Sequence, residues 1–140
     1  MSVRFEDLSV GLELPVSERV LSREDVEAYA QASGDLNPLH REDEVARAAG
    51  FPGIVAHGML TMGTLASALV GWLGDPLALT RLKVQFRAPV FPGETIQSGG
   101  SVRSLDPGTR TAVLEVWVRV ERDGGTEWPI RRSEAEIRLA

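Results

Sequence analysis

Three features of the sequence predict an α+β domain with an antiparallel β-sheet. The first half of the chain carries helical patterns, and the second half alternates apolar and polar residues in segments joined by short turns. Residues 57–73 are apolar nearly all round, and no other predicted helix is apolar enough for a sheet to wrap around it. Because the 140 residues contain no repeats or linkers, we expect residues 1–140 to form a single domain.

The elements of the first half are marked by their capping residues. Residues 5–11 are expected to be irregular and residues 14–21 to form a first strand. A helix begins after Ser22, because the sequence SRED resembles a capping box with aspartate in the last position, and Gly34 is expected to end it. Pro38 disfavours helical geometry at Asn37, so a bent connector follows. A short helix over residues 42–49 ends at Gly50.

The predicted central helix, residues 57–73, is expected to be buried and ~25 Å long. Its small residues would let the sheet approach closely: Gly63, Ala66, Ser67 and Gly71. The pattern then predicts four strands, over residues 81–87, 94–105, 111–122 and 128–139. Leu82, Val84 and Phe86 are expected to share one face of the first of these strands.

Composition excludes several classes of protein. A net charge of -5 argues against a basic surface for nucleic acid, and the lack of cysteine rules out disulfides and thiolate chemistry. Residues 57–73 fall short of the ~20 apolar residues that a membrane span requires. The N-terminus is too acidic and too broken for a signal peptide, so we expect a cytoplasmic protein.

Asp35 and His40 are the candidate acid/base pair. An imidazole titrates near neutral pH and can give or take a proton. A carboxylate five residues away can hold a water molecule or share the proton transfer. The alternative interpretation is structural: Asp35 caps the following turn, and His40 caps the next helix. The short pattern D-x-N-P-x-H does not decide between them.

Gly58 favours the catalytic interpretation. If the long helix begins near His57, the amide N–H groups of Gly58 and Met59 are free, and the helix dipole favours negative charge beside them. Such a helix end stabilises an oxyanion, and a glycine lets a carbonyl group approach the backbone. The alternative is an ordinary helix start with His57 as a structural cap.

The neighbouring polar residues leave further interpretations open. Asn37 either orients Asp35 or the substrate, or satisfies its own turn. A metal site built from His40 and His57 is not expected, because the two histidines lack a compact ligand spacing.

Three segments together resemble the MaoC-like dehydratases, which are (R)-specific enoyl-thioester hydratases with a hotdog fold. These segments are ASGDLNPLH at residues 32–40, IVAHGML at 54–60 and FRAPVFPGE at 86–94. The resemblance implies a curved antiparallel sheet wrapped around a long central helix, and dimers whose sheets join edge to edge. Residues 33–40, 56–63 and 72–76 look especially like the catalytic subunit of heterodimeric (3R)-hydroxyacyl-ACP dehydratases.

The resemblance also implies an activity and its residues. Asp35 and His40 would be the catalytic pair, and the Gly58 amide would form the oxyanion hole. Independently of the resemblance, we expect Asn37 and Met59 to bind or position the substrate. The expected enzyme is a hydro-lyase that adds water to an enoyl-CoA or enoyl-ACP thioester, without a cofactor or a metal. We expect a homodimer or a higher homo-oligomer, with a heterodimer as the alternative, and neither a nucleic acid nor a membrane as a partner.

Two other functions remain open from the sequence. An acyl-CoA thioesterase on the same fold would use the same oxyanion site, although it has no clear need of His40 five residues from Asp35. A non-catalytic thioester-binding partner of a second subunit would be expected to lack the acid/base pair. Its presence here argues instead for a catalytic chain, alone or in a heterodimer.

Overall fold

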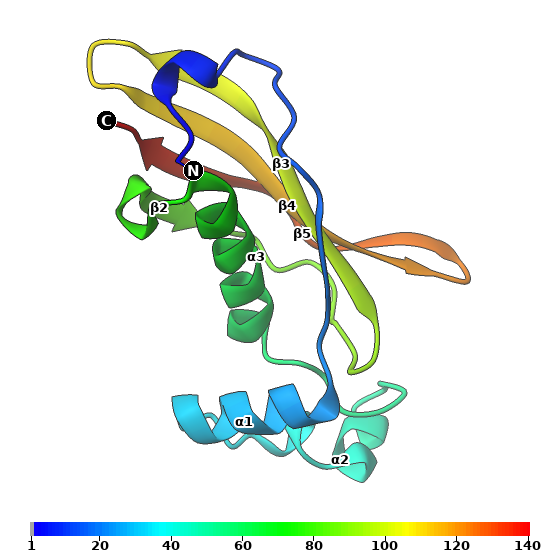
Figure 1. The fold of residues 1–140 in the computed structure, drawn as a ribbon. Coiled ribbons are helices and arrows are strands. Elements are labelled where there is room, and N and C mark those ends of the chain that lie inside the picture. The colour runs from blue at the N-terminus through cyan, green and yellow to red at the C-terminus, as the bar shows by residue number, and fades with distance from the viewer. Residues whose placement is uncertain (1) are drawn as a thin grey trace.

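The computed structural model describes residues 2–140 and shows an antiparallel sheet packed against one long helix (Figure 1). The five strands lie in the order β1-β3-β4-β5-β2, and every neighbouring pair is antiparallel. The strands are β1 (Ser17–Val20), β2 (Leu79–Lys83), β3 (Thr95–Asp106), β4 (Thr111–Arg122) and β5 (Gly125–Arg138). The helices are α1 (Arg23–Ser33), α2 (Asp43–Ala48) and α3 (Gly58–Leu73), with 3-10 turns η1 (Phe5–Asp7), η2 (Pro38–His40) and η3 (Pro76–Ala78). The predicted α+β class is confirmed.

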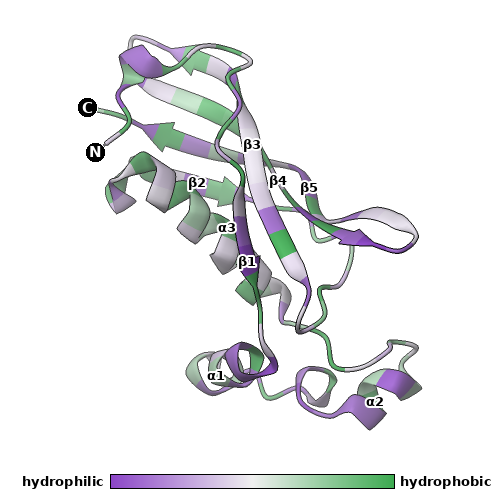
Figure 2. Cartoon of the chain, turned by 45° about the vertical axis from the view of Figure 1, so that its right-hand side comes forward, coloured by the Kyte–Doolittle hydropathy of each residue, from purple (hydrophilic) through white to green (hydrophobic). Residues whose placement is uncertain are grey.

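The hydrophobic core lies between the curled sheet and α3. In β4, Val116, Val118 and Val120 are buried, as their alternation predicts, and they face Leu65 and Leu69 of α3 within one core cluster. Figure 2 shows that α3 is largely apolar, whereas hydrophilic residues gather on α1 and α2. These two shorter helices lie together beyond the N-terminal end of α3, so the chain between them reaches the start of that helix.

The capping residues act as the sequence predicts. The Ser22 hydroxyl accepts from the Asp25 N–H at 3.0 Å, and the Asp25 carboxylate accepts from the Ser22 N–H at 2.9 Å. Gly34 ends α1 in the left-handed conformation, with φ 77°, which glycine adopts without steric cost. α1 therefore ends immediately before Asp35, the first candidate catalytic residue.

The predicted burial of α3 is wrong for one side of the helix. Leu65, Leu69 and Leu73 are buried, whereas Met59 is 56% exposed. The small residues Gly63, Ser67 and Gly71 are also exposed, so they do not meet the sheet. The reason is that the sheet packs along only one side of α3, and an all-round apolar sequence does not reveal this.

Two predicted strands are shorter than expected. Only residues 17–20 of the predicted 14–21 strand form a strand, although Glu13 makes one isolated bridge to Ser101. After β2 the chain leaves the ladder, where the Gln85 N–H donates to the Ser133 hydroxyl at 2.9 Å. Phe86 makes an isolated bridge to Ile130 of β5, but its side chain is 50% exposed rather than on a buried face. Within residues 2–140, no helix is long and apolar enough to cross a membrane.

Candidate active site

The connector after α1 places Asp35 beside His40. The Asp35 carboxylate accepts from the Asn37 N–H at 3.2 Å, and the Asn37 side chain accepts from the Leu39 N–H at 3.0 Å, at the start of η2. Asn37 thus satisfies its own turn, one of the two predicted roles, and shapes the connector that carries Asp35. Oδ1 of Asp35 caps the following turn, as the structural interpretation predicts, but Oδ2 faces His40.

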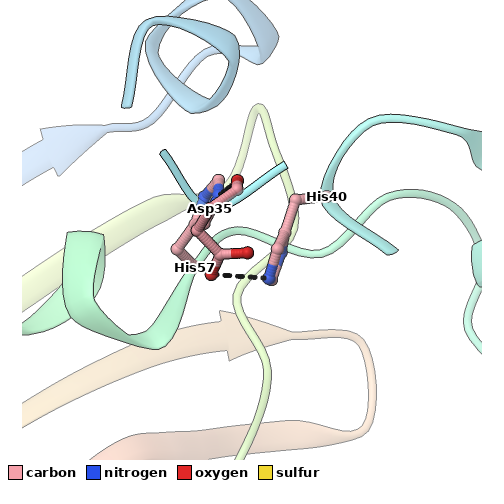
Figure 3. A group of neighbouring side chains, drawn as sticks. All are labelled: Asp35, His40 and His57. Atoms are coloured by element: carbon pink, nitrogen blue, oxygen red, sulfur yellow. Dashed lines mark hydrogen bonds and ion pairs between the residues drawn. The ribbon is translucent and has the colours of Figure 1, made fainter. Parts of the chain in front are cut away.

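His40 is oriented by a backbone carbonyl. Its Nδ1 lies 2.6 Å from the carbonyl oxygen of Val55. Because a carbonyl can only accept, Nδ1 carries the hydrogen and donates it, which leaves Nε2 as the basic nitrogen of the neutral ring. Nε2 lies 3.9 Å from Oδ2 of Asp35, and the two side chains are 16% and 52% exposed (Figure 3). At this separation both groups can contact one water molecule beside the line that joins them.

His57 lies against both candidate catalytic residues (Figure 3). Its Nε2 donates to the backbone carbonyl of Asp35 at 3.1 Å, and its ring stacks on that of His40 with centroids 3.8 Å apart. Tyr29 meets the His57 ring in an edge arrangement at 4.9 Å. His57 occupies the N-cap position of α3, the position that the alternative interpretation gave it, but its side chain makes no capping hydrogen bond.

The N-terminus of α3 opens onto a cavity. The cavity has a volume of about 360 Å³, and His40, Gly58, Thr61 and Phe86 are among its lining residues. The amide N–H groups of Gly58 and Met59 have no acceptor among residues 2–140, as expected for the first turn of a helix. The structure therefore places the His40 ring and a free helix end on the same hollow. Asp35, Asn37 and the Met59 side chain are not among the lining residues.

Phe86 is a feature of the site that the sequence did not indicate. A Cβ atom added to Gly58 would lie 3.3 Å from Cε1 of Phe86, so the ring covers the position of the missing side chain. The alternation of the strand pattern had placed Phe86 in the core. No local signal shows that regular pairing with β5 ends at β2 and returns at this residue only as an isolated bridge to Ile130, because the pairing depends on a distant strand.

The loop that forms the cavity wall is held by an ion pair. Arg122 donates to the Glu94 carboxylate through Nε and Nη2, both at 2.7 Å, and its Nη2 also donates to the Pro89 carbonyl at 2.8 Å. The Ala56 N–H in turn donates to the Val90 carbonyl at 2.8 Å. Ala56 follows Val55, whose carbonyl orients His40, so the ion pair supports the position of His40 indirectly, through the Pro89–Val90 loop.

This ion pair predicts how stability depends on pH. Burial raises the pKa of the Glu94 carboxyl. Hydrogen bonds from Arg122 and the Phe91 N–H, together with the charge of Arg122, lower this pKa by more than burial raises it, so the net pKa lies below the ordinary value. A group whose pKa is lowered by folding stabilises the protein above its unfolded pKa of about 4.3. That contribution disappears as the pH falls through the folded value.

Glu94→Gln is therefore expected to lower the melting temperature at neutral pH. The difference from the wild type should shrink as the pH falls from about 5 to about 3, because the wild-type carboxyl then loses its charge too. Thermal melts over this range measure it, with Arg122→Leu as the matched variant that removes the other partner. A difference that stays constant at every pH would contradict the assignment.

The relative orientation of His40 and His57 bears on whether the two histidines can bind a metal ion together. Asp35, His40 and His57 each offer a ligand atom, and these atoms lie within 4.8 Å of one another. A metal ion lies close to the plane of each imidazole that binds it, at about 2.0–2.1 Å from the nitrogen. The two rings are stacked with only 22° between their planes, so they do not converge on one ion. The absence of a metal stays a prediction that this stacking supports.

Comparison with known proteins places the chain in a family. The model of the family described as "MaoC like domain" matches residues 10–123. The chain belongs to the MaoC-like dehydratase family. The 3-hydroxybutyryl-CoA dehydratase of Methylorubrum extorquens is 35% identical over 111 residues, which cover 79% of this chain and 70% of that enzyme. Peroxisomal enoyl-CoA hydratase 2 of Arabidopsis thaliana is 44% identical over 66 residues, or 46% of this chain.

The fold of this MaoC-like chain is also found in solved structures. The structure of an (R)-hydratase from A. caviae superimposes with a TM-score of 0.84 at 25% identity, covering 96% of this chain and 99% of the hydratase. The chain thus has the hotdog fold, and the predicted family and fold are confirmed. These relatives are all hydratases or dehydratases, the hydro-lyase class that the sequence predicts. The match spans only 21% of the length of the Arabidopsis enzyme.

Proposed function

We propose that this MaoC-like chain is an (R)-specific enoyl-thioester hydratase, which in reverse is a (3R)-hydroxyacyl-thioester dehydratase. The observation that carries the proposal is the 3.9 Å pair of Asp35 and His40 Nε2, with His40 on the cavity that also receives the free end of α3. A general acid/base pair and an oxyanion site are the two parts that reversible water addition to an enoyl thioester needs. The names of the relatives support the same reaction.

The mechanism assigns one role to each group. A water molecule lies between Asp35 and His40, and the Asp35 carboxylate accepts one of its hydrogen bonds. Nε2 of His40 takes a proton as the water oxygen bonds to the β-carbon of the enoyl group. The thioester oxygen then carries negative charge, which the Gly58 N–H and the dipole of α3 stabilise. Return of the proton from Nε2 to the α-carbon completes the (3R)-hydroxyacyl thioester.

The substrate is proposed to be an acyl-CoA or acyl-ACP thioester. The cavity is mostly lined by apolar residues, which suits an acyl chain, and its volume of about 360 Å³ lies within the range of small-molecule sites. The proposed reaction needs no cofactor, because both the nucleophile and the proton come from water.

Hydration of enoyl thioesters tests the proposal directly. Purified protein is incubated with crotonyl-, octenoyl- and longer enoyl-CoA and with the matching enoyl-ACPs, while loss of the conjugated enoyl absorbance is followed. Chiral analysis of the product should give the (3R)-hydroxyacyl thioester. A thiol reagent in parallel reactions detects the thioesterase alternative, since only hydrolysis releases free CoA. No loss of absorbance with any carrier or chain length would refute the hydratase assignment for the chain acting alone.

Self-association is expected to accompany this activity. β1 and β2 are the edges of the sheet, and an unpaired edge invites pairing with another chain. At the β1 edge, Val16 and Val20 are 48% and 50% exposed. We expect sedimentation to show a homodimer or a higher oligomer. A stable and active monomer would contradict this, and activity that appears only with a second, different chain would favour a heterodimer.

A further inference from the structure

We infer that His57 is a positioning residue that fixes the separation of Asp35 and His40. The inference rests on the proposed hydratase function and extends it to a residue that does not contact substrate. His57 is 2% exposed, and two of its side-chain contacts go to the two members of the catalytic pair. One is the hydrogen bond from Nε2 to the Asp35 carbonyl, and the other is the stacking of its ring on His40.

Within residues 2–140, the hydrogen bond from His57 is the only one that joins Asp35 to a distant part of the chain. The other hydrogen bonds of Asp35 within residues 2–140 are local: its N–H donates to the Ser33 hydroxyl at 3.1 Å, and its carboxylate accepts from the Asn37 N–H. Both partners lie within two residues of Asp35, Ser33 at the end of α1 and Asn37 in the connector. They set the shape of that connector but do not attach it to the sheet or to α3. The His57 hydrogen bond makes this attachment.

The His57 ring restricts the orientation of the His40 ring by stacking on one of its faces. The Val55 carbonyl fixes one edge of the His40 imidazole through Nδ1, but a single hydrogen bond leaves the ring free to rotate about that contact. The His57 ring, stacked at 3.8 Å, removes this freedom from one side. The edge of Tyr29 holds the His57 ring in turn. Nε2 of His40 is therefore held toward Oδ2 of Asp35.

The chemistry of His57 itself argues against a space-filling role. Because Nε2 donates to a carbonyl, Nδ1 of the neutral ring has no hydrogen, and this buried nitrogen has no hydrogen-bond partner among residues 2–140. A buried nitrogen without a partner costs stability, and an apolar side chain of similar size would avoid that cost. Two features of the imidazole account for its presence here: the Nε2–H that binds the Asp35 carbonyl and the flat face that stacks on His40. Since Nε2–H is already used, His57 is not available to polarise the substrate carbonyl.

Two variants separate the contacts of His57. His57→Phe keeps a flat ring against His40 but removes the hydrogen bond to Asp35, whereas His57→Gln keeps an N–H donor but removes the ring. We expect each to lower kcat by about 10- to 100-fold with KM within about threefold, because a displacement of about 1 Å costs up to about 100-fold in rate. Thr64→Val is the matched control: Thr64 is buried on the same helix, and its hydroxyl donates to the Leu60 carbonyl.

A second measurement does not depend on activity. The chain has only two histidines, so each His57 variant retains His40 as its single imidazole. Long-range ¹H–¹⁵N spectra of the wild type should show His40 with its hydrogen on Nδ1 only. In His57→Gln, removal of the stacked ring should broaden the His40 ring signals as the ring begins to rotate about its Nδ1 contact, while the Val55 carbonyl keeps the hydrogen on Nδ1. This readout would not change if His57 only added to overall stability.

The outcomes distinguish the inference from the proposed function. A folded His57→Phe and a folded His57→Gln with kcat within threefold of the wild type, and an unchanged His40 spectrum, would overturn the inference while leaving the hydratase intact. Equal losses of kcat in Thr64→Val would also overturn it. A wild type inactive on every enoyl thioester would remove the proposed function, and the His40 spectra would still decide whether His57 holds that ring.

Discussion

Replacing Asp35 by asparagine, or His40 by alanine, is expected to lower kcat by about 10²–10⁴ while the protein still folds. Both side chains are at least partly exposed, and neither belongs to the hydrophobic core, so their removal leaves the packing of the sheet on α3 unchanged. The loss arises because each group acts on the same water molecule. Steady-state hydration kinetics of the purified variants measure the loss of kcat, and circular dichroism shows whether they fold.

The double variant gives a sharper test of the pair. Because both groups act on one water, Asp35→Asn combined with His40→Ala should be little slower than either single variant. Asp106→Asn is the matched control, since the Asp106 carboxylate also accepts a backbone N–H two residues on, from Gly108 at 3.0 Å, but lies at the end of β3, away from the site. Its rate should equal that of the wild type. Near-wild-type rates in both single variants would remove Asp35 and His40 from the mechanism.

Local signals in the sequence account for most of the fold. The capping residues of α1 and the alternation of β4 act within a few residues, so the sequence alone reveals them. The failures concern tertiary context. The exposed side of α3 and the early end of β2 depend on how far the sheet extends, and no pattern within either segment encodes that.

The site divides in the same way. The spacing of Asp35 and His40 in a proline-containing connector made them the candidate pair but left the structural interpretation open, and the structure brings Oδ2 and Nε2 to 3.9 Å. The start of α3 was placed within one residue. The Val55 carbonyl that sets the tautomer of His40 has no sequence signal, because any residue supplies a backbone oxygen. The contacts of His57 were missed because they join residues 22 and 17 positions away in the chain.

Gly58→Val is expected to lower kcat/KM by about 10²–10³ in a folded protein, comparable to the loss of an oxyanion-hole donor. A side chain at this position would begin 3.3 Å from the Phe86 ring, so either the ring shifts into the cavity or the valine methyl groups crowd the free end of α3. Both outcomes keep a thioester oxygen away from the Gly58 N–H. The helix propensity of valine costs at most about 0.7 kcal/mol relative to alanine, which is too little to unfold the domain.

Two further variants identify the cause of that loss. Gly63→Val introduces the same side chain into the same helix, where an added Cβ has no neighbour within 4 Å, so it should retain wild-type kcat/KM and report only the cost in helix propensity. Gly58→Val combined with Phe86→Ala relieves the contact with the ring. Recovery of activity in this double variant would assign the loss to displacement of Phe86, whereas continued loss would assign it to blockage of the amide. If a folded Gly58→Val protein kept wild-type kcat/KM, the N-terminus of α3 would not be the oxyanion site.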